Sequence, residues 1–158
     1  MILCLVGTSP YCFRRLIEVV DKEIGVNYEV MVQKGYSNYS FVNSKSFDFI
    51  EGSKLKLLIS KADLIITQGG YGSLMDSILE NKKIIAIPRL EEYNEIVGDQ
   101  IELINYFEKK EYVIGCYNLK HLKNMVDKCL SNEVSFKKFK PESKKLISRI
   151  ISNYVKSF

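Results

Sequence analysis

The chain is poor in the residues that hold metals and disulfides. Its single histidine, His121, falls in a predicted surface helix, and no two of its cysteines have CxxC spacing. Since one cysteine lies in a predicted buried strand, we expect reduced structural thiols rather than disulfides or metal ligands. The four are Cys4, Cys12, Cys116 and Cys129. We therefore expect no metal site.

Long apolar runs are also lacking. None reaches the about 18 residues that a membrane-spanning helix needs. The apolar start at residues 1–7 has no basic region before it, so we interpret it as a buried strand and not a signal peptide. These absences lead us to expect a cytoplasmic protein.

Three nucleotide-binding fingerprints are missing. The GxGxxG pattern fails because Met75 stands where its third glycine should fall, and GxxxxGK does not occur. This argues against a dinucleotide redox cofactor and against an NTPase loop. The DxD pair is absent too, and transferases that hold a nucleotide sugar through a divalent ion commonly use it. Any nucleotide-sugar chemistry is therefore expected to be metal-independent.

The composition predicts one globular body with a basic tail. The chain has 158 residues, 46% of them apolar, which is enough for one substantial core. Residues 120–158 carry ten Lys or Arg against three acids, whereas the first 119 residues sum to −3. We expect a body at 1–132 and a basic linker with an amphipathic helix at 133–158. Such a tail can meet nucleic acid, an anionic membrane or an acidic partner, or be only a solvated face.

The predicted tail helix has an apolar stripe at helical spacing. The helix can cover its own domain, fill a partner's groove or lie on an anionic bilayer. Since it has few aromatic residues for an interfacial anchor, we favour the partner or its own body. The stripe consists of Leu146, Ile147, Ile150, Ile151, Tyr154, Val155 and Phe158.

Strand and helix patterns alternate along the body. This alternation predicts an α/β fold with a doubly wound, mainly parallel, Rossmann-like sheet. Thr8 and Ser9 would cap the first helix, with Pro10 at its first position. Strands are expected at 2–7, 28–33, 47–50, 63–67, 83–87 and 112–114. Helices are expected from Pro10, at 53–61, at 73–80, at about 95–109 and at 119–130.

The most informative segment is DLIITQGGYGSLMD, residues 63–76. It predicts a strand that feeds a glycine-rich turn and then a helix beginning near Ser73. Such a turn lets backbone N–H groups approach a phosphate at the positive end of the helix. Asp76, one turn further, could accept hydrogen bonds from ribose hydroxyls. A tight turn without a ligand is the alternative.

Ligands of doubly wound sheets bind beyond the carboxyl ends of the strands, where four of the predicted loops converge. Their amides, hydroxyls and one arginine suit a diphosphate. Without a histidine nearby, acid–base work would fall to Glu95 and Asp99, although either could be a solvated loop carboxylate. The candidates are Gly7, Thr8 and Ser9; Gln33, Gly35, Ser37 and Tyr39; Gln68, Gly69, Gly70, Gly72 and Ser73; and the loop from Arg89 to Gln100.

Five segments together resemble a known family. They are the opening strand into VGTSPYCFRRLIEVVD, VQKGYSNY, ADLIITQGGYGSLMDSILENKKIIAIPR, YNEIVGDQIELI and KKEYVIG, in this order over residues 1–130. They resemble the donor-binding C-terminal half of the MurG-type glycosyltransferases of family 28, which have the GT-B fold. The likeness is greatest to short stand-alone members, such as the soluble subunit of the dolichol-diphosphate N-acetylglucosamine transferase and bacterial capsule or exopolysaccharide subunits.

The resemblance implies a role for each matching residue. Gly7 and Thr8 would line the crevice, and Gln33 and Gly35 would match a Q-x-G turn near the donor. Gly70, Gly72 and Ser73 would hold the diphosphate, preceded by Gln68 and Gly69. Asp76 would replace a ribose-binding glutamate, and Arg89, Glu95, Asp99 and Gln100 would fall near the donor sugar. Two family histidines are missing, one at Gln68 and one in EIVGDQ.

The resemblance also implies a partner. The chain lacks the half that binds the acceptor, so a membrane-anchored subunit would supply it. The expected activity is inverting transfer from a UDP-sugar, such as UDP-GlcNAc, to a polyprenyl-diphosphate-linked saccharide. A non-catalytic nucleotide-sugar-binding regulatory subunit is the first alternative. A nucleic-acid-binding domain is the second, although the basic tail has no dense aromatic platform and no recognised motif.

Overall fold

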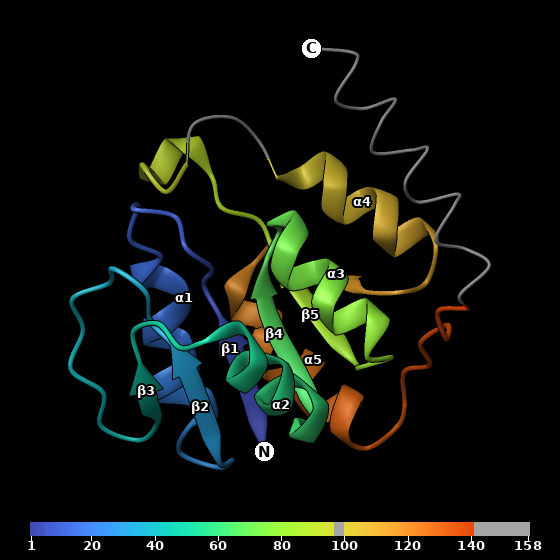
Figure 1. Cartoon of the computed structure of the whole chain (residues 1–158), viewed down its shortest axis with the longest axis horizontal. Helices are drawn as coiled ribbons and strands as arrows, with labels where there is room; N and C mark the ends of the chain where they lie inside the picture. The colour runs from blue at the N-terminus through green and yellow to red at the C-terminus, as the bar shows by residue number, and fades with distance from the viewer. Residues whose placement is uncertain (97–99, 141–158) are drawn as a thin grey trace.

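The sheet consists of six short strands, and all neighbouring strands are parallel. The computed structural model describes residues 1–96 and 100–140. Its strands are β1 (Ile2–Leu5), β2 (Val30–Gln33), β3 (Lys45–Phe47), β4 (Leu64–Gln68), β5 (Ile84–Ile87) and β6 (Ile114–Gly115). Their order is β3-β2-β1-β4-β5-β6, the doubly wound arrangement (Figure 1). The predicted Rossmann-like α/β fold is confirmed.

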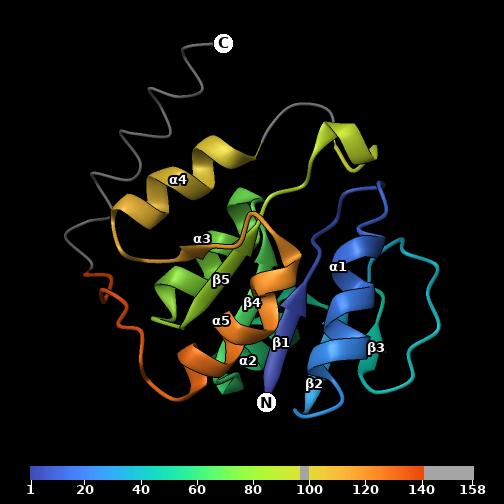
Figure 2. The same ribbon diagram turned by 180° about the vertical axis from the view of Figure 1, so that it is seen from behind.

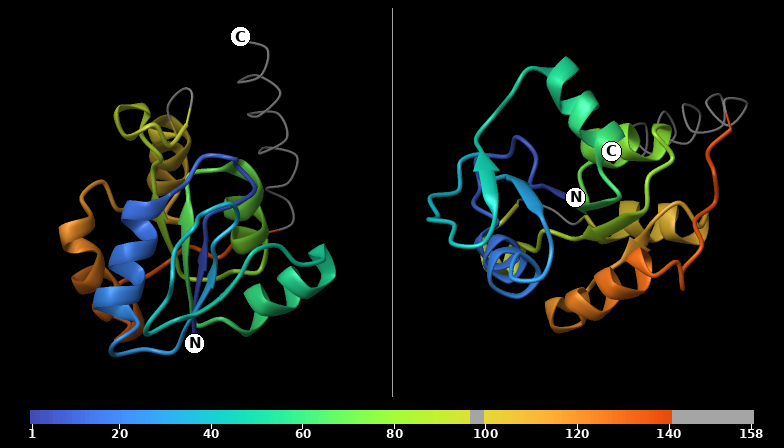
Figure 3. Two further views of the ribbon diagram at one scale, coloured as in Figure 1. Left: turned by 90° about the vertical axis from the view of Figure 1, so that its left-hand side faces the viewer. Right: turned by 90° about the horizontal axis from the view of Figure 1, so that it is seen from below.

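Helices cover both faces of this sheet. The face seen in Figure 1 carries α2 (Gly52–Lys61), α3 (Tyr71–Leu79) and α4 (Ile101–Lys109). The opposite face carries α1 (Arg14–Val19), its π-helical continuation η1 (Val20–Ile24), and α5 (Leu122–Leu130) (Figure 2). Two short 3₁₀ turns, η2 (Glu91–Tyr93) and η3 (Leu119–His121), complete the elements. The view from below shows the sheet between its two helical layers (Figure 3).

The central strands are apolar on both faces because both faces are covered. All four residues of β1 and of β5, and all five of β4, are buried. One core lies under α1, η1 and α5 and includes Phe13, Leu16 and Val126. The other lies under α2, α3 and α4 and includes Ile78, Ile104 and Phe107. Two-sided burial explains why these strands are continuous apolar runs without alternation.

The predicted start of the first helix is wrong. Pro10 lies in a loop, and α1 begins at Arg14 after the N-cap residue Phe13. The carbonyl of Tyr11 accepts a hydrogen bond from Arg89 Nη1, and Phe13 N donates to Ser37 Oγ. These long-range bonds hold the loop in an extended path over the sheet edge, which overrides the local capping signal.

Further boundaries differ from the prediction. The strand expected at 47–50 is β3 at Lys45–Phe47, and the helix expected at 73–80 is α3, which begins at Tyr71. The helix expected at 95–109 is α4, which begins at Ile101 with Gln100 as its N-cap residue. The last strand is Ile114–Gly115 instead of 112–114. Glu95 therefore precedes the helix and belongs to the loop after β5.

The segment after α5 returns to the body. Phe139 is buried beside Tyr112, with ring centroids 5.8 Å apart, and its N–H donates to Asn81 Oδ1 at 2.6 Å. The predicted amphipathic helix at 141–158 lies outside the described residues, so the expected division at residue 132 stays a prediction. Within the described ranges, no helix is both long and apolar enough to cross a bilayer.

Candidate functional site

The carboxyl ends of β1, β2, β4 and β5 lie side by side. Leu5 is in register with Gln33 on one side and Thr67 on the other, and Gln68 is in register with Ile87. The loops that begin after these residues therefore leave the sheet along one edge, at the top of Figure 1. The structure brings the predicted loops together, as the strand order requires.

The glycine-rich turn leads directly into α3. Gly69 N donates to Ile87 O at 3.1 Å and to Gln100 Oε1 at 3.0 Å, so the turn is tied to its neighbours. Gly70 is the N-cap residue of α3 and provides no side-chain cap. The first N–H groups of a helix have no acceptor within the helix. The turn thus presents uncapped donors at the positive end of α3.

Gly72 is exposed near this helix start, and Asp76 follows it by one helical turn. A Cβ built on Gly72 would meet no described atom within 4 Å, so the described part of the chain does not itself require glycine there. Asp76 is half-buried one turn later, and its carboxylate has no hydrogen-bond or ion-pair partner in the described ranges. Ser73 is half-buried between them. An anionic group could approach Gly72 closely, with Asp76 available for hydroxyl groups.

Two glutamines hold loops together at the same edge. Gln33 is 5% exposed, and its Oε1 accepts a hydrogen bond from Gly7 N at 3.2 Å. Gln100 Oε1 accepts from Gly69 N and also from Arg89 N, at 3.1 Å. Both amides thereby fix backbone N–H groups of the loops. Thr8 is exposed at this edge, while Gly35 is buried and has a positive φ of 53°.

Arg89 lies inside the protein, whereas its position after β5 had suggested the mouth of the crevice. Its side chain is fully buried, with the guanidinium 4.6 Å from the centroid of the Phe13 ring. Nη2 donates to Val6 O at 2.8 Å, and Nη1 donates to Tyr11 O and to Glu95 O. Arg89 thus joins the loops after β1 and β5.

Burial lowers the pKa of Arg89 but does not remove its charge at neutral pH. Desolvation lowers the pKa of its guanidinium to about 10, although the nearby Glu95 carboxylate acts to raise it. The group is therefore still protonated at neutral pH. Its N–H groups can only donate hydrogen bonds, which suits the ring of oxygen acceptors around it.

Glu95 is also buried, with 3% exposed. Both of its carboxylate oxygens accept from Arg15, at 2.8 Å from Nε and 2.9 Å from Nη2. Arg15 Nη2 further donates to Pro88 O at 2.6 Å, and Leu90 N donates to Glu95 Oε2 at 3.1 Å. This bidentate pair holds the loop after β5 against α1.

Some predicted and some unforeseen residues meet at the edge. The structure places Arg15, Phe13 and Tyr11 in the network around Arg89, and sequence reasoning singled out none of the three. The only local signal for Arg15 is its place beside the buried residues Leu16 and Ile17, next to a second arginine at position 14. The predicted residues that lie along the edge are Gly7, Thr8, Gln33, Gly35, Gln68, Gly69, Gly70, Gly72, Ser73, Asp76, Arg89, Glu95 and Gln100. Asp99 lies outside the described residues.

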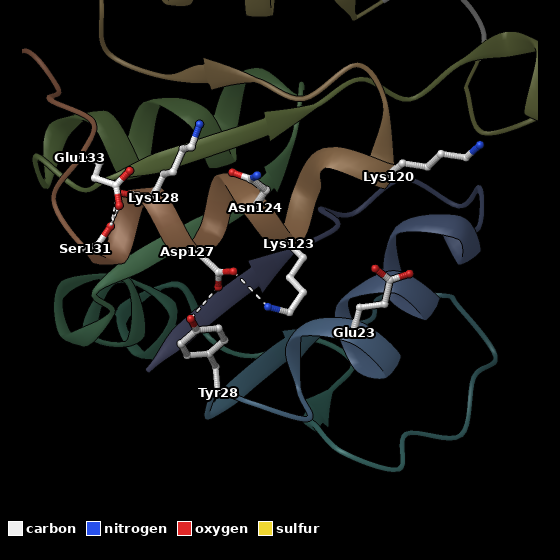
Figure 4. A pocket seen from close by; sticks show the side chains of 9 residues that line it. All are labelled: Glu23, Tyr28, Lys120, Lys123, Asn124, Asp127, Lys128, Ser131 and Glu133. Carbon is white, nitrogen blue, oxygen red and sulfur yellow. Dashed lines mark hydrogen bonds and ion pairs between the residues drawn. The ribbon is translucent and has the colours of Figure 1, made fainter.

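A second, open groove lies away from this edge. It runs along α5 and carries charges of both signs, including Lys123 and Asp127 (Figure 4). Tyr28 donates to Asp127 at 2.6 Å, and Lys123 pairs with the same carboxylate at 3.0 Å. Lys123 and Asp127 form its one ion pair among the described residues, and Glu133 accepts a hydrogen bond from Ser131. In residues 1–96 and 100–140, no cluster of His, Cys, Asp or Glu could hold a metal ion.

Comparison with curated proteins finds transferases of lipid-linked substrates. Over 95 residues the chain is 33% identical to the UDP-N-acetylglucosamine–N-acetylmuramyl-(pentapeptide) pyrophosphoryl-undecaprenol N-acetylglucosamine transferase of Streptococcus uberis. The match covers 58% of this chain and 26% of that protein. The matched region thus spans about a quarter of the length of such relatives.

Solved structures share the fold. The NMR structure of ALG13 superposes with a TM-score of 0.60 at 17% identity, and the match covers 92% of each chain. The crystal structure of Acinetobacter baumannii MurG superposes with a TM-score of 0.54 at 12% identity, covering 82% of this chain and 41% of MurG. At these identities the superpositions show the fold alone.

The family assignment comes from the sequence as a whole. Residues 1–153 match the description of the glycosyltransferase family 28 C-terminal domain. This match covers the described sheet, both helical layers and the edge where the glycine-rich turn lies. The chain therefore belongs to the glycosyltransferase family 28 C-terminal domain family.

Proposed function

We propose that the chain binds a UDP-sugar, such as UDP-GlcNAc, at the carboxyl edge of its sheet and transfers the sugar together with a partner. The single observation that carries this proposal is the uncapped start of α3 beside the Asp76 carboxylate, which has no partner among the described residues. Backbone N–H groups at Gly70, Gly72 and Ser73 suit a diphosphate, and Asp76 suits ribose hydroxyls. Family membership supports a nucleotide sugar over other phosphates.

The acceptor and the partner are proposed from the relatives. The name of the Streptococcus uberis protein specifies a pyrophosphoryl-undecaprenol acceptor, and the match covers 26% of that protein. We infer that a membrane-associated subunit supplies acceptor binding to this chain, recruiting it to the cytoplasmic face of a membrane. The acceptor would be a polyprenyl-diphosphate-linked saccharide in glycan or polysaccharide synthesis. The expected reaction is inverting and uses no metal cofactor.

The two predicted acid–base residues, Glu95 and Asp99, have different roles in this proposal. Glu95 is occupied by Arg15 and Leu90 N, so its geometry favours holding the loop after β5 in place. Asp99 stays the sequence-based candidate for a general base, which the partner could also supply. Gly7, Thr8, Gln33, Gly35, Gln68, Gly69, Arg89 and Gln100 would form or support the donor site.

Titration of the chain with UDP, followed by calorimetry with and without the partner, tests the proposal. Asp76→Ala should weaken UDP binding about tenfold because the ribose loses its carboxylate acceptor. Asp63→Ala is a matched control. Asp63 is an exposed aspartate that pairs with the Met1 amino group at the opposite edge of the sheet, so its loss should leave UDP affinity unchanged. A wild-type chain that binds neither UDP nor UDP-GlcNAc would rule the proposal out.

A non-catalytic regulatory subunit is the second candidate, because Glu95, one of the two predicted acid–base residues, is engaged by Arg15. Transfer assays of the reconstituted pair separate the two. If the chain is catalytic, Asp76→Ala should lower transfer in parallel with UDP affinity. If it is regulatory, transfer should persist independently of Asp76 and Glu95.

A further inference from the structure

The end of the Gln68 side chain is held from one side only. Gln68 is the last residue of β4 and is 7% exposed. Its Oε1 accepts a hydrogen bond from Arg89 Nε. Within the described ranges, its amide nitrogen Nε2 donates to no acceptor. Nε2 is nevertheless not closed off from solvent, because Ser44 Oγ is the one fully buried side-chain N or O atom without a partner among the described residues. A ligand can therefore reach the N–H groups of Gln68.

The chemistry of Arg89 determines which way the amide faces. A guanidinium can only donate hydrogen bonds, so the oxygen of Gln68 must face it and the NH₂ group must point away. Arg89 cannot turn to release the amide, because its other nitrogens are bound to the carbonyls of Val6, Tyr11 and Glu95. The Gln68 amide is therefore locked in one orientation.

The locked NH₂ group lies between two glycine loops. A Cβ added at Gly70 would stand 2.9 Å from Gln68 Nε2, and one added at Gly7 would overlap that atom. Gly70 is also the N-cap residue of α3, which spans nine residues and has no side-chain cap. Two separate sets of donors, the helix start and the Gln68 amide, thus lie close together at Gly70. An anion is the ligand that both would bind.

We propose that Gln68 Nε2 donates a hydrogen bond to the diphosphate of the nucleotide sugar, and that Arg89 is the positioning residue that orients it. This inference rests on the proposed function, because that function supplies the diphosphate. Arg89 does not touch the donor; it acts through the Gln68 oxygen. The buried cation also remains close enough to favour the anion without exposing its charge.

Gln68→Glu tests this arrangement. The variant keeps the size of the side chain and an oxygen facing Arg89, but it replaces the NH₂ donor with a second carboxylate oxygen. UDP and uridine are the probes, and NMR titration of the full chain measures even weak affinities. The Kd for UDP should rise about 100-fold, since a donor becomes a repelling charge, while the Kd for uridine should stay within about twofold. The thermal unfolding midpoint should not fall.

Two further variants keep the test decisive should Gln68→Glu fail to fold. Gln68→Asn shortens the side chain by one methylene, so its amide cannot reach both Arg89 and a diphosphate at the start of α3. The Kd for UDP should therefore rise about tenfold. Arg89→Lys keeps a buried cation without the guanidinium fork, and should narrow the difference between UDP and uridine affinity. In the wild type, the Gln68 side-chain amide resonance should shift on addition of UDP and not of uridine.

The outcomes separate the two proposals. Loss of UDP affinity in Gln68→Glu with uridine affinity retained supports the role of the amide. If the wild type binds UDP but the variant binds it equally well, or loses UDP and uridine to the same degree, the amide does not contact the diphosphate and the inference is overturned. A wild type that binds neither probe overturns the proposed function itself.

Discussion

Arg89 and Asp21 are two fully buried charged residues that organise loops at different places in the fold. Asp21, in η1, accepts from the backbone N–H groups of Val42, Asn43 and Ser44 at 2.9–3.0 Å, and from the Tyr39 hydroxyl. Arg89 donates instead to carbonyl oxygens and to Gln68. Each charge replaces water with backbone partners from a distant loop.

The difference lies in what each network leaves unpaired. Around Asp21, the carboxylate oxygens are satisfied by one loop, and the atom left without a hydrogen bond among the described residues is Ser44 Oγ, which is fully buried. Around Arg89, the partner Gln68 retains an NH₂ group without an acceptor among the described residues. The unpaired atom beside Asp21 is closed to a ligand, whereas the Gln68 amide can be reached by one. This difference separates a network that only folds the chain from one that also prepares a donor.

The largest effect on the free energy of unfolding is expected for Arg89→Met, which tests the Arg89 side of the comparison. Removal of the guanidinium leaves three carbonyls and the Gln68 oxygen without their donor, so the free energy of unfolding should fall by about 4 kcal/mol. Denaturant unfolding followed by circular dichroism measures this. Arg14→Met, which removes an exposed pair with Glu18, should cost less than about 0.5 kcal/mol. Equal losses in both variants would show that Arg89 does not hold the loops.

Asp21→Ala should have the next largest effect on the free energy of unfolding, about 2–3 kcal/mol, because three part-buried backbone hydrogen bonds lose the carboxylate that accepts them. Its UDP affinity should nevertheless match the wild type, measured by calorimetry under conditions where both are folded. A marked loss of UDP affinity would show that the Asp21 loop reaches the donor site, and the contrast with Arg89 would disappear.

A smaller effect should appear in the pH dependence of stability. Burial acts to raise the pKa of Asp21, but hydrogen bonds from the backbone N–H groups of Val42 and Asn43 lower it, and the net shift is below the ordinary value of 3.8. Asp21 therefore stabilises the fold above pH about 4, and that contribution is lost as the pH falls through the lower folded-state pKa. Asp21→Asn should reduce the slope of the unfolding free energy against pH below pH 4. An unchanged slope would contradict the assignment.

The smallest effect on the free energy of unfolding is expected for a substitution in the groove of Figure 4, a third region to set beside Arg89 and Asp21. Asp127 is 42% exposed and pairs with Lys123, which is equally exposed. Asp127→Asn should change the free energy of unfolding by less than about 1 kcal/mol and leave UDP binding unaltered. Tyr28→Phe, which removes the other hydrogen bond to this carboxylate, is its companion variant. A change in UDP affinity would place a ligand contact on this face.

Much of the fold could be predicted because its signals are local. Strands buried on both faces produce continuous apolar runs, and the glycine-rich turn marks the passage from β4 to α3. The start of α1 could not be predicted, because Arg89 and Ser37 hold the preceding loop from 78 and 24 residues away. Distant hydrogen bonds of this kind override a capping signal formed by Thr8, Ser9 and Pro10.

The convergence of the predicted loops at one sheet edge could be predicted, but the orientation of their side chains could not. Arg89 and Glu95 follow β5 at the expected edge, yet both side chains turn inward. Whether a charged residue after a strand faces solvent or the interior depends on its partners, and Arg15 lies 80 residues from Glu95 in the chain. No local pattern pairs them, so a sequence can locate such residues without distinguishing a ligand contact from an internal support.

The packing of Gln68 against Gly70 has a consequence for sequence variation. Gly70 has an ordinary backbone conformation, with φ −75° and ψ 137°, so alanine is excluded there only by the crowding of the Gln68 amide. Tolerance at position 70 should therefore be conditional on position 68. In a library randomised at both, alanine at 70 should survive together with shorter residues at 68. Position 7, where φ is +76°, should remain glycine in every background.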